Sequence, residues 1–263
     1  MAYFKCNFFS NSLVRPVSFD VFIPNDPRKD LPNWENNLPK GKLKTLFLLH
    51  GYGCGFWNWL PEDLLVKYNV AVVIPNGENS FYLDGPATGD KFETFVGKEL
   101  PEYVNKTFGL ANGPEDTNIM GFSMGGFGAL HTGLAFPKLF GKIGAMSSAL
   151  IMHEVAGMKE GDSNPIANYE YYYNRFGNPA ELIEGHNNPE ALAVQLQMAG
   201  EPIPEIYMCC GSEDFLIEPN RATHKFFEDN KIPHQYHESK GVHDFVFWNE
   251  YSRKILEWMY SED

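Results

Sequence analysis

Short apolar runs recur along the chain, and most of them are followed by a longer segment whose apolar residues have helical spacing. Residues 43–49 and 70–75 are almost continuously apolar, which is typical of strands covered on both faces. Further buried strands are predicted over residues 117–120, 142–148 and 205–210. Because these strands alternate with helices, we expect an α/β fold, with a mainly parallel, twisted sheet covered by helices on both faces.

Other elements are predicted around these central strands. Residues 3–10 and 14–23 predict an antiparallel pair that opens the sheet, and residues 236–238 predict a late strand. Residues 25–42 are polar and carry several prolines, which indicates a surface loop. The predicted helices cover residues 61–68, 90–108 with a bend at Pro101, 126–136 ended by Pro137, and 245–260.

Residues 149–204 interrupt the alternation of strands and helices. They contain several Asn-Pro and Gly breaks, one helical stretch over residues 189–198, and the tyrosines Tyr169, Tyr171, Tyr172 and Tyr173. We predict an insertion over the carboxyl edge of the sheet, where it would act as a cap or pack as ordinary surface structure. No repeat or linker divides the 263 residues, so we expect a single domain over residues 1–263.

The charge balance narrows the class of partner. A net charge of −13 argues against nucleic acid or an anionic membrane surface, because both attract basic patches. The first residues lack the basic stretch and apolar run of a signal peptide, and no apolar run approaches the roughly 20 residues that span a bilayer. We therefore expect a cytoplasmic protein that acts on small molecules. Homo-oligomer formation stays open.

The cysteines point to no metal or disulfide chemistry. Cys209 and Cys210 are adjacent in a predicted strand, so their side chains point to opposite faces and are poor partners for each other. No CxxC spacing or Cys/His cluster suggests zinc. We expect four buried free thiols, no metal and no cofactor.

The stretch Gly121-Phe122-Ser123-Met124-Gly125 carries the clearest chemical signal. A serine with glycine two residues before and two residues after it suits a sharp strand-to-helix turn, where a Cβ on either flank would collide with neighbouring elements. A strand precedes the stretch and a helix follows it, so the helix N-terminus would point its free amides at Ser123. The alternative is an ordinary glycine-rich turn.

A serine nucleophile needs a base, and the base needs an orienting acid. In this kind of fold the chain order is Ser, then Asp or Glu, then His, each from a loop at the carboxyl end of a strand. His243 fits the base, because it lies between the late strand and the last helix; the alternative is a helix-capping surface histidine. Asp214 follows the strand at 205–210 directly and fits the acid. Glu213 is the competing candidate for the acid. Asp244 lies too close to His243 in sequence to orient its imidazole easily.

Two backbone amides are expected to bind the oxyanion that forms during acyl transfer. One belongs to Met124, and the other is assigned to Tyr52 in the glycine-rich stretch 50–55. The alternative for that stretch is a plain turn that only links a strand to a helix. His50 is expected to be a structural residue of the same turn and not a catalyst. The aromatic residues beyond it and in the insertion would either belong to the core or line a substrate pocket, for which the candidates are Phe56, Trp57 and Tyr172.

These motifs together resemble the esterase D branch of the α/β-hydrolases. The resemblance rests on residues 121–130, the His50-Gly51-Tyr52-Gly53-Cys54 turn and residues 241–248. It is strongest to the short bacterial tributyrin and acetyl esterases, which are related to feruloyl esterases and S-formylglutathione hydrolases. It implies an α/β-hydrolase fold with the same nucleophile, acid, base and oxyanion amides that the residues themselves indicate.

The expected function is hydrolysis of carboxylic esters through an acyl-enzyme, without a cofactor. The acyl group would be short (acetyl or butyryl) or of the feruloyl type, on a small-molecule or carbohydrate-linked ester. One alternative is a thioesterase of the S-formylglutathione type or an acyltransferase, although no glutathione-binding set is recognisable. The other is a non-catalytic binding protein on the same scaffold, which would leave the serine unreactive.

Overall fold

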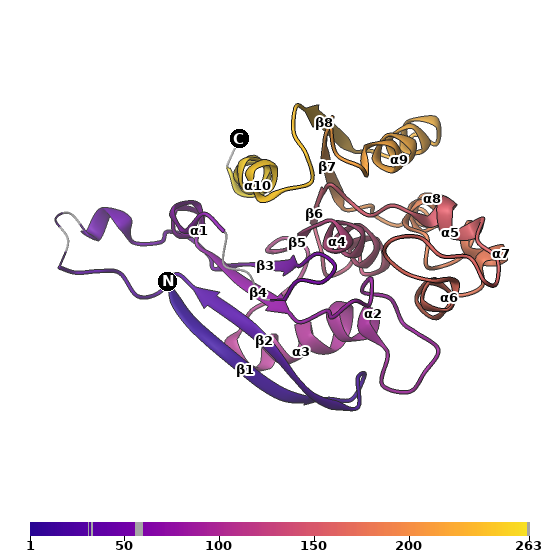
Figure 1. Ribbon diagram of the computed structural model, residues 1–263. Coiled ribbons are helices and arrows are strands. Elements are labelled where there is room, and N and C mark those ends of the chain that lie inside the picture. The colour runs from indigo at the N-terminus through magenta and orange to yellow at the C-terminus, as the bar shows by residue number, and fades with distance from the viewer. Residues whose placement is uncertain (31, 33, 56–59, 262–263) are drawn as a thin grey trace.

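The computed structural model describes residues 1–30, 32, 34–55 and 60–261. In this part of the chain, eight strands form one sheet in the order β1-β2-β4-β3-β5-β6-β7-β8. Their bounds are β1 Ala2–Ser10, β2 Arg15–Ile23, β3 Lys44–Leu49, β4 Val70–Pro75, β5 Thr117–Phe122, β6 Lys142–Met146, β7 Glu205–Gly211 and β8 Gln235–Ser239. Strands β1 and β2 form a long antiparallel hairpin at one edge, and β8 lies at the other (Figure 1).

The strand directions follow the predicted pattern. Strand β2 pairs antiparallel with β4, and all pairs from β4 through β8 are parallel. Parallel neighbours need crossover connections that return the chain to the same end of the sheet, and the helices supply them. The prediction of a mainly parallel sheet opened by an antiparallel pair is confirmed.

Helices cover both faces of the sheet (Figure 1). Along β3, Leu46 and Leu48 contribute to the apolar cluster beneath α1 and α10, whereas Phe47 and Leu49 contribute to the cluster beneath α2, α3, α4 and α9. This alternation explains why a strand with two buried faces has an almost continuously apolar sequence. The helices are α1 Glu62–Tyr68, α2 Phe92–Thr94, α3 Leu100–Phe108, α4 Met124–Ala135, α9 Ile217–Asp229 and α10 Phe245–Tyr260, and a short 3₁₀ helix Trp34–Asn37 lies in the loop before β3.

The helix predicted over residues 90–108 is irregular. Between α2 and α3 the chain forms a π-helical turn, Phe95–Glu99, in which the Leu100 N–H donates to the Phe95 carbonyl five residues earlier. Pro101 follows directly and has no N–H to continue the ladder. The predicted bend at Pro101 stays a prediction; the irregularity that the structure shows is the wider helical turn, which ends two residues before this proline.

The insertion is more helical than predicted. Besides α8 (Pro189–Ala199), which confirms the expected helix, it contains α5 (Met152–Ala156), α6 (Tyr169–Phe176) and α7 (Pro179–Leu182). These three are too short to show a periodic pattern. Two of the Asn-Pro pairs that suggested breaks begin helices: the side chains of Asn178 and Asn188 are N-caps that accept hydrogen bonds from the amides of Ala180 and Glu190. Helix α9 was also not predicted.

The prediction that all four thiols are buried is wrong in part. All four thiols are free, but only Cys209 and Cys210 are buried, whereas Cys6 and Cys54 are half-buried. Cys6 lies on the edge strand β1 and Cys54 in the exposed turn after β3, so neither position is covered on both sides.

No helix among the described residues combines the length and the apolar character that crossing a bilayer requires.

Candidate active site

Ser123 occupies a strained turn between β5 and α4. Its φ of 57° and ψ of −122° lie in a region that residues with a Cβ rarely adopt. A Cβ at Gly121 would lie 2.3 Å from the Gly125 carbonyl oxygen, and a Cβ at Gly125 would lie 2.1 Å from the Leu49 carbonyl oxygen. Both distances are far below van der Waals contact, so both glycines are sterically required by the close approach of β3, β5 and α4.

Replacing Gly125 with alanine is expected to destabilise the fold by about 3 kcal/mol, because backbone must move to make room for the new methyl group. Displacement of Ser123 by even ~1 Å should lower activity by about 100-fold. Thermal unfolding and ester hydrolysis measure the two effects.

The matched control is Gly157→Ala, where the nearest atom to a new Cβ is an ordinary 3.5 Å away. If Gly125→Ala behaved like this control, the steric account of the turn would be wrong.

Helix α4 begins at Met124, two residues earlier than predicted. The amides of Gly126 and Phe127 donate to the Ser123 carbonyl at 3.0 and 3.1 Å, which leaves the Met124 amide ahead of the first helical hydrogen bonds. The first amides of a helix have no intrahelical partner, and they carry the positive end of its dipole. The Met124 amide, which is next to Ser123, is therefore one of the helix amides that have no intrahelical partner.

The structure brings the three predicted side chains together in one hydrogen-bonded row. His243 Nε2 lies 3.0 Å from Ser123 Oγ, and His243 Nδ1 lies 2.9 and 3.0 Å from the two carboxylate oxygens of Asp214. The Asp214 side chain is fully buried and that of His243 is 15% exposed. The three residues come from the connections after β5, β7 and β8, which all end at the carboxyl edge of the sheet.

Asp214 is held as a carboxylate. Burial by itself raises its pKa, but hydrogen bonds from His243 and from the Leu216 amide outweigh this, so the pKa of Asp214 lies below its ordinary value. A charged acid behind the imidazole can stabilise an imidazolium, and it fixes the tautomer with the proton on Nδ1. Nε2 then faces Ser123 Oγ as an acceptor.

The start of α10 fixes the position of His243. Asp244 is the N-cap of this helix, and its side chain accepts hydrogen bonds from the amides of Val246 and Phe247 at 3.0 Å. The Trp248 ring packs edge-on against the imidazole, with ring centroids 4.9 Å apart. Asp244 therefore caps a helix and does not orient the imidazole, as its sequence position indicated.

The turn after β3 packs directly against the serine turn. A Cβ at Gly51 would lie 2.8 Å from the Phe122 ring and 3.4 Å from Ser123 Cβ. Within the described residues, neither the Tyr52 amide nor the Met124 amide donates a hydrogen bond. Two free amides beside Ser123 match the predicted oxyanion site, although their role stays a prediction.

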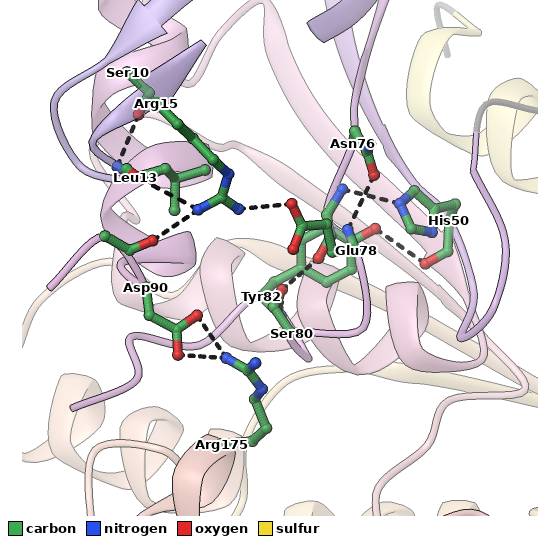
Figure 2. A network of polar contacts seen from close by, with 12 residues as sticks. Ser10, Leu13, Arg15, His50, Asn76, Glu78, Ser80, Tyr82, Asp90 and Arg175 are labelled. Atoms are coloured by element: carbon green, nitrogen blue, oxygen red, sulfur yellow. Dashed lines mark hydrogen bonds and ion pairs between the residues drawn. The ribbon is translucent and has the colours of Figure 1, made fainter. Parts of the chain in front are cut away.

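His50 holds this turn in shape (Figure 2). Burial lowers its pKa, so the ring is neutral. Its Nε2 accepts a hydrogen bond from the Gly77 amide at 2.9 Å, and its Nδ1 donates to the Gly51 carbonyl at 2.9 Å. The hydroxyl of the fully buried Tyr82 donates to the His50 carbonyl at 3.0 Å. The structural role predicted for His50 fits these contacts.

A second layer of contacts fixes the same turn from the loop after β4. The Gly53 amide donates to the Asn79 side chain at 2.8 Å. The hydroxyl of Tyr171, from the insertion, donates to the Asn79 carbonyl at 2.5 Å, and its ring packs edge-on against Tyr52. Sequence reasoning missed this support, because it joins segments that lie far apart in the chain.

Ion pairs anchor the loop after β4 to its surroundings (Figure 2). Arg15 of β2 donates to the Glu78 carboxylate at 2.6 Å and to the Gly89 carbonyl at 2.9 Å. Arg175 of α6 donates to both carboxylate oxygens of Asp90 at 2.6 Å. The first pair ties the loop to the hairpin edge, and the second ties it to the insertion.

The proposed substrate-contact residues have different outcomes. Phe56 and Trp57 lie outside the described residues. Tyr172 is only 1% exposed, and its hydroxyl is hydrogen-bonded to Asn164, so it is a core residue and the prediction of a substrate contact is corrected. One residue earlier on α6, Tyr171 reaches the turn beside Ser123, because neighbouring positions on a helix point about 100° apart.

A separate cluster links the insertion to the helices beneath it. The donor atoms of Glu93, His131 and His186 lie within 4.8 Å of one another, close enough to share a cation. Here they bind each other: the Glu93 carboxylate oxygens lie 2.8 and 2.9 Å from His186 Nε2, and His131 Nε2 lies 3.0 Å from the His186 carbonyl. The bond to Glu93 raises the pKa of His186, and burial lowers that of His131. No ligand role was predicted for any of the three residues from the sequence.

A serine on a strained strand-to-helix turn, with histidine and aspartate from later loops at the carboxyl edge of a mostly parallel sheet, defines an α/β-hydrolase. The sequence matches the family described as putative esterase over residues 10–251, and the chain belongs to that family. The esterase D resemblance is thereby confirmed at the family level.

Individual relatives agree with this membership. The chain is 40% identical to an acetyl esterase of Caldicellulosiruptor saccharolyticus, over 98% of both chains. It is 27% identical to an S-formylglutathione hydrolase of Paracoccus denitrificans over 50% of this chain and 52% of the other. Its fold is similar to that of FphF, a fluorophosphonate-binding serine hydrolase of Staphylococcus aureus, with a TM-score of 0.81, 23% identity and 99% of both chains covered.

Proposed function

We propose that this protein is a serine carboxylic ester hydrolase that removes acetyl groups through an acyl-enzyme. The observation that carries the proposal is the continuous hydrogen-bonded row from Asp214 through His243 to Ser123. The two free amides beside the serine support it. The choice of acetyl rests on the full-length similarity to an acetyl esterase.

In the first half of the reaction, Ser123 Oγ attacks the acyl carbonyl while His243 Nε2 takes its proton. The 3.0 Å separation of these two atoms is within the reach that general-base catalysis requires. The carbonyl oxygen becomes negatively charged, and the amides of Tyr52 and Met124 donate hydrogen bonds to it. Asp214 stabilises the imidazolium that forms.

The tetrahedral intermediate then collapses. The ester C–O bond breaks, and the leaving alcohol oxygen takes the proton from His243 Nε2, which leaves an acetyl group on Ser123. In the second half, His243 takes a proton from a water molecule that attacks the acetyl carbonyl. Acetate leaves, and the proton returns to Ser123 Oγ. No step needs a metal or an organic cofactor.

A second candidate is hydrolysis of S-formylglutathione on the same three residues. The observation in its favour is the similarity to an S-formylglutathione hydrolase, which extends over half of each chain. It is the weaker proposal, because the similarity to the acetyl esterase is higher and extends over nearly the whole of both chains.

A substrate panel separates these possibilities. We expect kcat/KM to be highest for acetyl esters, lower by about tenfold for butyryl esters, and lower still for feruloyl esters and S-formylglutathione, because a site shaped for a small acyl group loses about one tenfold factor when methylene groups do not fit. Initial rates on the four substrates measure this. A preference for S-formylglutathione over acetyl esters would favour the thioesterase, and cleavage of feruloyl esters alone would exclude the short-chain proposal.

A further inference from the structure

The loops that supply the acid and the base also expose large apolar side chains. Phe215 directly follows Asp214 and is 70% exposed, whereas Leu216 beside it is only 6% exposed. Val242 directly precedes His243 and is 43% exposed, and Val246, on the first turn of α10, is 77% exposed. A single exposed apolar residue needs no explanation, but three that lie within three residues of the acid or the base in the chain indicate a surface that contacts something.

Phe215 lies against the reactive imidazole. Its ring centroid is 4.5 Å from that of His243, with the two planes inclined by 48°. One side of the ring therefore covers part of His243 and the other side faces solvent. We call Phe215, Val242 and Val246 the histidine-side rim.

The chemistry of the reaction decides which part of the ester this rim faces. The carbonyl oxygen must point to the proposed oxyanion amides of Tyr52 and Met124. The leaving alcohol oxygen must lie near His243 Nε2, because that atom protonates it. The group attached to this oxygen therefore extends along the His243 side of the site, where the rim lies.

We propose that the histidine-side rim is the binding subsite for the alcohol part of the ester, and that it selects acetates whose alcohol has a flat apolar face. Such a face packs on the exposed side of the Phe215 ring and removes apolar surface of both partners from water. Two kinds of alcohol offer it, an aromatic ring and the apolar face of a pyranose sugar. This inference rests on the proposed function and adds the class of alcohol to it.

The test compares wild-type protein with Phe215→Ala on three acetates that share the acyl group, namely ethyl acetate, benzyl acetate and a monoacetylated methyl xyloside. All three form the same acetyl-enzyme, so differences in kcat/KM report the alcohol. We expect the ratio of kcat/KM for benzyl or xyloside acetate to that for ethyl acetate to fall about tenfold in the variant, as the loss of a ring-sized apolar contact predicts. A fall for only one of them identifies the aromatic or the sugar alcohol as the one selected.

Phe9→Ala is the matched control, since Phe9 is a phenylalanine of similar exposure, 57%, on the edge strand β1. It should leave all ratios as in wild type. A fall of equal size for all three acetates in Phe215→Ala would overturn the inference, because the ring would then only shield His243 from water. Wild type and Phe215→Ala are also compared on ethyl acetate and ethyl butyrate. If the loss of kcat/KM in the variant differed between these two esters, the rim would lie on the acyl side, and the inference would be overturned.

The proposed function and the inference fail in different ways. If wild-type protein hydrolysed none of the acetates and a fluorophosphonate did not label it, the proposed function would be wrong. If wild-type protein hydrolysed them and the ratios were unchanged in Phe215→Ala, only the alcohol subsite would be wrong. Labelling of Ser123 in the variant shows that its site is folded.

Discussion

Replacing Ser123 with alanine is expected to lower kcat for acetyl ester hydrolysis on the order of 10⁵-fold. The variant loses the atom that forms the acyl-enzyme, so His243 and Asp214 have no hydroxyl to activate. Only the oxyanion amides and substrate binding remain, and these give a small residual rate over water. Steady-state kinetics on ethyl acetate and covalent labelling by a fluorophosphonate measure the loss.

Ser18→Ala serves as the control, because Ser18 is also half-buried but lies on β2. It should keep wild-type turnover and labelling. Thermal unfolding of Ser123→Ala shows whether the loss is chemical, since removal of one hydroxyl should leave the midpoint within a few degrees. Near-normal turnover in Ser123→Ala would rule out Ser123 as the nucleophile. Absence of labelling in wild-type protein would instead favour the non-catalytic binding protein.

Replacing Asp214 with asparagine is expected to lower kcat by about 10³- to 10⁴-fold, with a much smaller change in KM. The amide has no charge to stabilise the imidazolium. Its NH₂ group also offers a donor where His243 Nδ1 now meets an acceptor, so the ring is driven to the tautomer with its proton on Nε2. That proton faces Ser123 Oγ, and the ring can no longer act as a base. Kinetics on ethyl acetate between pH 6 and 9 measure the effect.

Glu213→Gln is the matched control for the acid. Glu213 is the neighbouring carboxylate, and it is exposed, whereas Asp214 is buried. Its activity should stay within about twofold of wild type, as is usual for a surface residue away from the chemistry. If Glu213→Gln lost activity and Asp214→Asn kept it, Asp214 would not be the acid of this site. Its hydrogen bonds to His243 would then be structural only.

Local patterns in the sequence were enough to predict most of the sheet and the identity of the reactive residues. A strand buried on both faces must be apolar at every position, which makes residues 70–75 recognisable without any tertiary information. A serine turn that tolerates no Cβ on either flank must have glycines there, and Gly121 and Gly125 meet backbone atoms at 2.3 and 2.1 Å. Asp214 and His243 could be proposed because each lies in the loop that follows a strand, and parallel strands end at one edge.

The surroundings of these residues were not predictable in the same way. Tyr171 and Tyr172 are adjacent and chemically identical, yet one reaches the turn beside Ser123 and the other lies in the core. The short helices of the insertion depend on caps and packing more than on a periodic pattern. The cluster of Glu93, His131 and His186 joins three distant segments whose meeting no local pattern indicates.

The sequence by itself therefore determined the architecture of this protein and the chemistry at Ser123. Both are imposed by neighbours in the chain, through backbone sterics and through the alternation of side chains along strands. Only the tertiary structure decided how the oxyanion turn is held and which side chains surround the reacting groups. Phe215 shows the difference: its place after Asp214 can be read directly, but its exposure and its contact with His243 depend on how the loops after β7 and β8 pack together.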